Sequence, residues 1–89
     1  MAKEYHFEIS VTCRHEECTD IFKNIVIQKL MKLSRFHPHI INGTIVVDKK
    51  NSSKKVEISL HVPGSVITSL HEDYDDMKAF EGALKKVKV

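Results

Sequence analysis

The chain has 89 residues, of which 42% are hydrophobic and 29% are charged, and its formal net charge is +2. This length fits one small domain that buries about 60% of the surface of its unfolded chain, so we expect residues 1–89 to form a single domain. No apolar run approaches the roughly 18 residues of a membrane span, and the opening residues alternate where a secretory signal would be continuously apolar, so we expect a cytoplasmic protein with no membrane partner.

The first half of the chain predicts a strand, a helix and a second strand. Residues 5–13 alternate between apolar and polar side chains, which is the period of a half-buried strand. Thr19 is placed to cap a helix that runs to about Phe36, and Pro38 ends it. The apolar stripe of this helix has the three-and-four spacing of a helix lying on a sheet and consists of Phe22, Ile25, Val26, Leu30 and Leu33. Residues 41–47 are rich in branched side chains and predict the second strand.

The second half predicts two more strands and a final helix. Residues 48–55 form a polar, lysine-rich connection that suits a hairpin tip, and residues 56–62 alternate as a third strand. Pro63-Gly64 then turns the chain into a weaker fourth strand over residues 65–71, and a helix follows from about Asp75. The order is βαβββα. Because both helices need the same apolar surface, we expect an α+β fold of two layers, with a four-stranded, mostly antiparallel sheet and two helices on one face.

Positive charge on the first helix is not balanced by carboxylates of the same helix. Its cations are Lys23, Lys29, Lys32 and Arg35, and its one acid is Asp20. The last three cations descend in steps of three along one flank of the apolar stripe. Late cations also suit the negative end of a helix dipole, but surface helices usually interleave Glu with Lys at a spacing of four, and this helix has no Glu. The pattern favours a surface that binds phosphate groups.

Two further lysine clusters carry weaker signals. The second helix ends in three lysines, Lys85, Lys86 and Lys88. They complement acids at the start of that helix, so the helix dipole alone accounts for them. Gly82 costs this helix about 1 kcal/mol relative to alanine, which indicates close approach of a helix or a phosphate chain, and we favour helix packing. The four lysines within residues 48–55 are typical of a mobile, solvated loop.

No catalytic motif is present in the sequence. Ser, His and Asp occur, but no nucleophile elbow or glycine-rich phosphate loop surrounds them, so we expect no enzyme, no small-molecule substrate and no cofactor. Cys13, His15 and Cys18 have a spacing that suits metal ligands, but they lack a fourth partner, and we expect both cysteines to be reduced. The main alternative to a phosphate-binding surface is a protein-interaction surface, either at Ile27 and Met31 on the outer face of the first helix or at a sheet edge.

Two regions of the chain resemble the ribosome hibernation factors, a family also called ribosome-associated inhibitor or sigma-factor modulation proteins. The first is TDIFKNIVIQKLMKLSRF at 19–36, followed by His39 and Ile40. The second is VEISLHVPG at 56–64, followed by Asp75 and MKAFEGALKKV at 77–87. The resemblance covers essentially the whole chain. It implies the βαβββα fold and binding to the small ribosomal subunit, in the channel used by mRNA and tRNA.

The resemblance also implies a function and a set of binding residues. It implies a non-catalytic, ribosome-binding domain that contacts ribosomal RNA, inhibits translation and is monomeric when off the ribosome. Basic positions of the family's two helices match Lys23, Lys29, Lys32, Arg35 and Lys86, and neighbouring charge adds Lys85 and Lys88. Ile27 departs from the family, which usually has a polar residue there. The dimerisation domain of the long form is absent, so the sequence corresponds to the short form or to a fragment.

Overall fold

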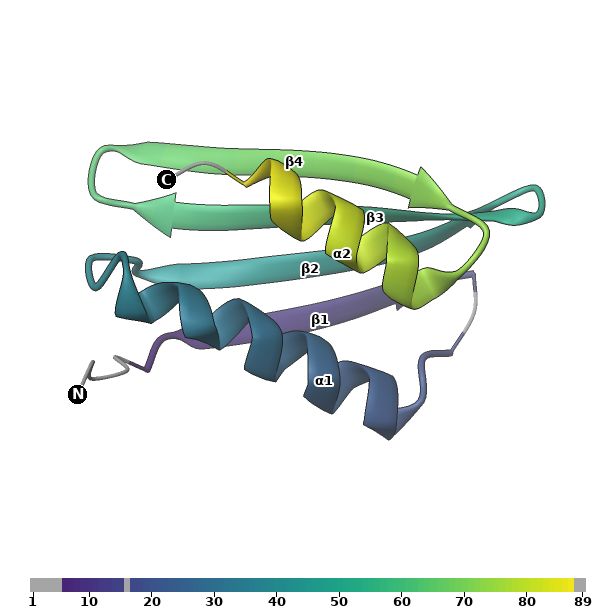
Figure 1. Cartoon of the computed structure of the whole chain (residues 1–89), viewed down its shortest axis with the longest axis horizontal. Helices are drawn as coiled ribbons and strands as arrows, with labels where there is room; N and C mark the ends of the chain where they lie inside the picture. Colours follow the sequence, from purple (N-terminus) through teal and green to yellow (C-terminus); the bar gives the residue numbers. More distant parts are fainter. Residues whose placement is uncertain (1–5, 16, 88–89) are drawn as a thin grey trace.

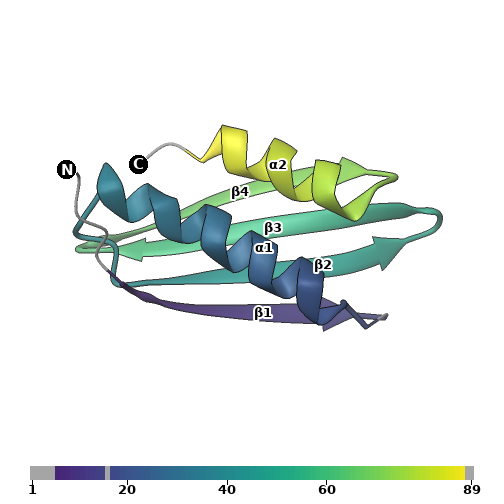
Figure 2. The ribbon, with the colours of Figure 1, turned by 60° about the horizontal axis from the view of Figure 1, so that its bottom comes forward.

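The computed structural model describes residues 6–15 and 17–87, and its elements follow the predicted order. The four strands lie side by side in chain order: β1 (Glu8–Arg14), β2 (Asn42–Lys50), β3 (Ser53–Val62) and β4 (Ser65–Asp73). β1 is parallel to β2, and the other two pairings are antiparallel. Helices α1 (Asp20–Met31) and α2 (Asp76–Lys86) both cover the same face of the sheet (Figures 1 and 2). The predicted two-layer α+β fold is confirmed.

Helix α1 begins at the predicted cap and buries most of its predicted apolar stripe, but the last part of the predicted helix is a 3-10 helix instead of an α-helix. The Thr19 hydroxyl oxygen accepts a 3.1 Å hydrogen bond from the Phe22 amide, which satisfies one of the free donors at the helix start. After Met31 the chain continues as a 3-10 segment, η1 (Lys32–Arg35), which leaves the Phe36 side chain 75% exposed. Neither helix in the described part of the chain is long and apolar enough to cross a membrane.

The core lies between the helices and the inner face of the sheet. Its buried side chains come from both helices, from strands β2 and β3, and from residues that precede β1 and β2: Phe7, Phe22, Val26, Leu30, Ile40, Ile45, Val47, Val56, Ile58, Leu60, Ala79, Phe80 and Ala83. The outer face of the sheet is mostly polar, although Val66 and Leu70 of β4 lie exposed on it. One row across all four strands consists of the hydroxyl side chains of Ser10, Thr44, Ser59 and Thr68. A polar outer face needs no cover, which explains why the helices occupy one side only.

The β2–β3 hairpin is longer than predicted, and its lysines do not form a loop. Residues 48–50 and 53–55 continue the ladder, so that only Asn51 and Ser52 make the turn. Asn51 has a φ of 57°, a conformation that this residue type tolerates in tight hairpin turns. Residues 54 and 55 face Asp73 and Glu72 across β3 and β4, so opposite charges stand directly across the strands. The interpretation as a mobile, solvated lysine loop is therefore wrong for this segment.

Cys13 and Cys18 form a disulfide, so the expectation that both are reduced is wrong. The short turn from β1 to α1 brings their Cα atoms to 6.1 Å, within the usual range for a disulfide. Both sulfurs are thus unavailable to a metal. His15 also has another partner, because its Nδ1 atom lies 2.7 Å from Asp48 Oδ1 and holds the pKa of the Asp48 carboxyl below its usual value. The three residues therefore do not form the alternative metal site, because two of them are joined in a disulfide and the third pairs with Asp48.

Candidate nucleic-acid interface

The two helices run in the same direction across the sheet, so their carboxyl ends point toward the same end of the molecule (Figures 1 and 2). Each helix starts with an acid and ends with cations. The positive charges therefore gather where the negative ends of both helix dipoles lie. We refer to the cations of this region as the basic face, which consists of Lys29, Lys32, Arg35, Lys85 and Lys86.

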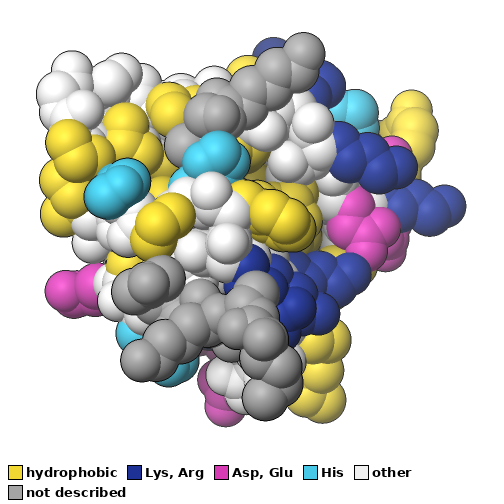
Figure 3. All heavy atoms as spheres, turned by 60° about the vertical axis from the view of Figure 1, so that its left-hand side comes forward, with side chains coloured by type: hydrophobic (Ala, Val, Ile, Leu, Met, Phe, Trp, Pro, Cys, Tyr) yellow, Lys and Arg dark blue, Asp and Glu magenta, His cyan; other side chains and the backbone are white. Residues whose placement is uncertain are grey.

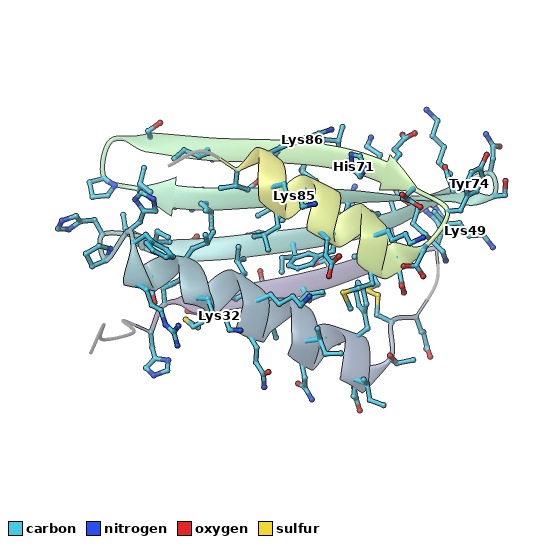
Figure 4. All side chains as sticks on the ribbon, viewed as in Figure 1. Lys32, Lys49, His71, Tyr74, Lys85 and Lys86 are labelled. Carbon is cyan, nitrogen blue, oxygen red and sulfur yellow. A yellow bond between two sulfur atoms is a disulfide. The ribbon has the colours of Figure 1, made fainter. Side chains whose placement is uncertain are left out.

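Most of the basic face is open to solvent. Lys32, Arg35, Lys85 and Lys86 all have exposed side chains. Figure 3 shows Lys and Arg side chains gathered on the helical side of this end, interrupted by a patch of Asp or Glu side chains. Figure 4 shows Lys32 and Lys85 on the helical side and Lys86 reaching over β4, all away from Lys49 and Tyr74 at the hairpin end. The structure thus brings together five of the seven site residues predicted from the sequence.

The cations of the basic face differ in whether they have a partner within the chain. The Lys86 ammonium donates a 3.1 Å hydrogen bond to the Leu70 carbonyl of the edge strand β4, so this side chain is held over the rim of the sheet. Lys85, its neighbour, makes no hydrogen bond or ion pair with any residue that the structure describes, and the same is true of Lys32. Lys32 and Lys85 are therefore the cations that a phosphate would neutralise without first displacing an internal partner.

Lys29 has a carboxylate of its own chain as a partner. Its ammonium lies 2.6 Å from Glu81 Oε1 on α2, and both side chains are partly exposed. The hydrogen bond from Lys29, followed by the charges of Lys29 and Lys85, holds the pKa of the Glu81 carboxyl below its usual value. The prediction that Lys29 is an uncompensated cation is therefore wrong. With Glu81 included, the basic face has five cations and one carboxylate, a formal charge of +4.

Two predicted site residues do not join the basic face. Lys23 lies more than two turns before Lys32 on α1, where it lines a hollow together with Glu17, Asp20 and the Cys13–Cys18 disulfide. Its neighbours are thus carboxylates rather than the other cations. Lys88 lies outside the described residues, and its place in the site stays a prediction.

Gly82 of α2 and its small neighbours Ala79 and Ala83 face the sheet and are not open to a phosphate chain. A Cβ atom added at Gly82 would lie 2.1 Å from Cδ2 of His71 on β4. The buried Ser69 hydroxyl donates a 2.7 Å hydrogen bond to the Ala83 carbonyl, one of the terminal carbonyls that the helix itself leaves without a partner. The favoured explanation for Gly82, packing against a helix, is therefore wrong in detail, because its close neighbour is a strand residue.

Ile27 and Met31 line a groove rather than a flat patch. The groove has a volume of about 460 Å³, and the residues around it are His6, Ile27, Gln28, Met31, Lys32 and Arg35. Met31 also packs against the hydrophobic core. The sequence placed Ile27 and Met31 on one side of α1, but it gave no signal that His6, just before β1, lies beside them. The groove therefore adjoins the basic face directly and shares Lys32 and Arg35 with it.

Comparisons with known proteins agree with the observed fold and with the resemblance found in residues 19–40 and 56–87. Three curated relatives bear the name ribosome hibernation promoting factor, two of them from Pseudomonas putida with the same identity and coverage. The one from Acidithiobacillus ferridurans is 28% identical over 78 residues, covering 84% of this chain and 96% of the relative. Each of the two from Pseudomonas putida is 25% identical over 77 residues, covering 86% of this chain and 74% of the relative.

Solved structures match the same fold. The crystal structure of the Thermus thermophilus Protein Y N-terminal domain superposes with a TM-score of 0.81 at 23% identity, covering 91% of this chain and 90% of that one. A ribosomal subunit interface protein from Coxiella burnetii gives a TM-score of 0.84 at 21% identity, with coverages of 90% and 88%. The model of the family described as Sigma 54 modulation protein / S30EA ribosomal protein matches residues 9–88. The chain therefore belongs to the Sigma 54 modulation protein / S30EA ribosomal protein family, which confirms the predicted family.

Proposed function

We propose that this chain binds the small ribosomal subunit through the basic face, contacts ribosomal RNA there and inhibits translation without catalysing a reaction. The names of its relatives support ribosome hibernation as the process. In this proposal residues 1–89 act as one ribosome-binding domain in the cytoplasm, monomeric when off the ribosome. Its RNA contacts include Lys32, Arg35, Lys85 and Lys86.

The observation that carries the proposal is the convergence of cations from two helices on one side of the molecule, where Glu81 is the carboxylate that pairs with one of them. Gathering like charges costs electrostatic free energy in the free protein, and RNA phosphates would remove this cost when they bind. Because the side chains of Lys32 and Lys85 are exposed, they reach a phosphate backbone without rearrangement of the fold.

Salt dependence is the direct test of this mechanism. If about four phosphates are contacted, the binding constant for small subunits should fall about a hundredfold as the salt concentration rises from about 50 to 200 mM. Co-sedimentation of the protein with purified small subunits across this salt series measures the fall. A change of less than about threefold would contradict binding through phosphates.

The rival function is a protein-interaction module that uses the Ile27 and Met31 surface or a sheet edge. The groove around Ile27 is the observation in its favour. This function predicts binding that salt does not affect and that Ile27→Glu abolishes. The salt series, run on the parent protein and on this variant, separates the two functions.

A further inference from the structure

The groove beside α1 has a floor and a rim of different chemistry. Ile27 and Met31, one helical turn apart, form an apolar floor, and both side chains are only partly buried. Lys32 and Arg35 follow in η1, which continues from α1, and give the groove a positive rim. His6 and Gln28 supply polar groups at its other borders, and none of the described residues that line it is a carboxylate. An apolar surface with a cationic rim fits a ligand that has an apolar body and an anionic group.

A double-stranded RNA would not use such a floor. Duplex RNA presents phosphates, sugars and base edges, while the faces of its bases are stacked on one another and hidden. An unpaired nucleotide, in contrast, offers a flat base next to a phosphate. The volume of about 460 Å³ lies within the range of about 300–1,000 Å³ typical of small-ligand sites, so one base with its sugar fits.

We propose that this groove binds one unpaired nucleotide of RNA, with the base against Ile27 and Met31 and its phosphate at Lys32 and Arg35. The inference rests on the proposed function and deepens it, because it assigns single-stranded ribosomal RNA to one part of the interface. The thioether of Met31 packs favourably on an aromatic ring. The amide of Gln28 and the imidazole of His6 are placed at the border, where they can hydrogen-bond a base edge.

Continuity with the basic face favours RNA over a protein as the occupant. Lys32 belongs to both surfaces, so a chain of phosphates that crosses the basic face passes the mouth of the groove. A protein segment seated on the same floor would need carboxylates of its own to match the rim. Binding of RNA requires no such additional feature, because each nucleotide brings its own anion.

The first experiment uses methionine methyl resonances of the full chain. Protein labelled with ¹³C at its methionine methyl groups is titrated with adenosine monophosphate and, separately, with inorganic phosphate. We expect the Met31 methyl signal to shift upfield with the nucleotide, through the ring current of a base above it, and to respond little to phosphate. Met77, on α2 and outside the groove, is the internal reference. Equal shifts at Met31 and Met77, or none at Met31, would overturn the proposal.

The second experiment compares two isoleucines of α1, of which Ile27 lies in the groove and Ile21 outside it. Ile27→Gln removes apolar surface from the floor without changing charge, whereas Ile21→Gln makes the same change at a side chain that is 73% exposed at the other end of the helix. Ile27→Gln should weaken binding of a single-stranded oligonucleotide by about five- to fiftyfold and leave binding of its annealed duplex unchanged. Ile21→Gln should change neither. Fluorescence anisotropy of the labelled RNA measures both affinities.

The outcomes separate this inference from the proposed function. If ribosome binding is salt-dependent but Ile27→Gln binds single strands as the parent does, the proposed function stands and the groove inference fails. If Ile27→Gln loses binding to small subunits but keeps its affinity for isolated single strands, the groove contacts ribosomal protein and the inference is again wrong. If binding depends on neither salt nor Ile27, both proposals fail.

Discussion

The Lys29 ammonium lies 2.6 Å from Glu81 Oε1, and this ion pair joins α1 to α2 within the basic face. The two residues are 52 positions apart in the chain. The pair links the two helices whose carboxyl ends carry the other cations. It also places the Glu81 carboxylate beside the lysine that it neutralises.

Replacing Glu81 with glutamine should strengthen RNA binding. Glu81→Gln releases Lys29 and removes a negative charge from the basic face, so about one more phosphate contact becomes available. We expect affinity for small subunits to rise by roughly three- to tenfold and the slope of log K against log salt to steepen by about 0.7–0.9. Glu57→Gln, the same change on the outer face of β3, is the matched control. Equal effects of the two variants would contradict the role of Glu81.

The Lys29–Glu81 pair should also make stability depend on pH. Because Lys29 holds the pKa of Glu81 below its usual 4.5, the folded state favours the ionised carboxylate. The resulting stabilisation is fully present above the unfolded-state pKa and is lost as the pH falls through the lower, folded-state pKa. The difference in unfolding free energy between the parent and Glu81→Gln should therefore stay constant from about pH 7 to 6 and diminish below about pH 4.5. Urea unfolding at several pH values measures it, and a difference that persists unchanged to about pH 2 would refute the linkage.

Gly82 should resist replacement because of His71. Alanine is favoured over glycine in a helix by about 1 kcal/mol, but a Cβ atom would lie 2.1 Å from the His71 ring, and such overpacking costs about 1–3 kcal/mol. Gly82→Ala should therefore lower the free energy of unfolding. In the background of His71→Ala the same change should raise it, because the clash is gone. Chemical denaturation of the four proteins of this double-mutant cycle tests the coupling, and its absence would show that the ring moves aside freely.

The disulfide should contribute to stability and not to RNA binding. Removing both sulfurs with Cys13→Ser and Cys18→Ser opens a short closed loop and should lower the free energy of unfolding by about 2 kcal/mol. The affinity of the folded variant for small subunits should match that of the parent, because the disulfide lies at the amino end of α1 and the basic face is at the carboxyl ends of both helices. A large loss of affinity in the folded variant would link the disulfide to the interface.

Local patterns were enough to predict the elements. The alternation of residues 56–62, the Thr19 cap and the apolar stripe of α1 each depend on near neighbours in the chain, and each is present in the structure. The hairpin was predicted too short because residues 48–55 are polar and lack alternation, although neighbouring strands still pair their backbones. Polar strand ends of this kind give no periodic signal.

Interactions across elements could not be predicted in the same way. The charge of α1 looked uncompensated because only acids within that helix were counted, whereas Glu81 comes from the other helix. The close neighbour of Gly82 is His71 on a different element, and the disulfide depends on how sharply the chain turns after β1. The helices place their carboxyl ends toward the same end of the molecule, but the basic site itself stays a prediction. The partners of individual cations required the three-dimensional structure.

The most direct test of the account compares two charge reversals that change net charge equally. Lys32→Glu with Lys85→Glu alters the basic face, and Lys49→Glu with Lys50→Glu alters exposed lysines at the hairpin end (Figure 4). At about 100 mM salt, we expect the first pair to weaken binding to purified small ribosomal subunits by at least about fiftyfold and the second to change it by less than about threefold. Parent-like binding by the first pair, or equal losses in both, would contradict an RNA interface on the basic face.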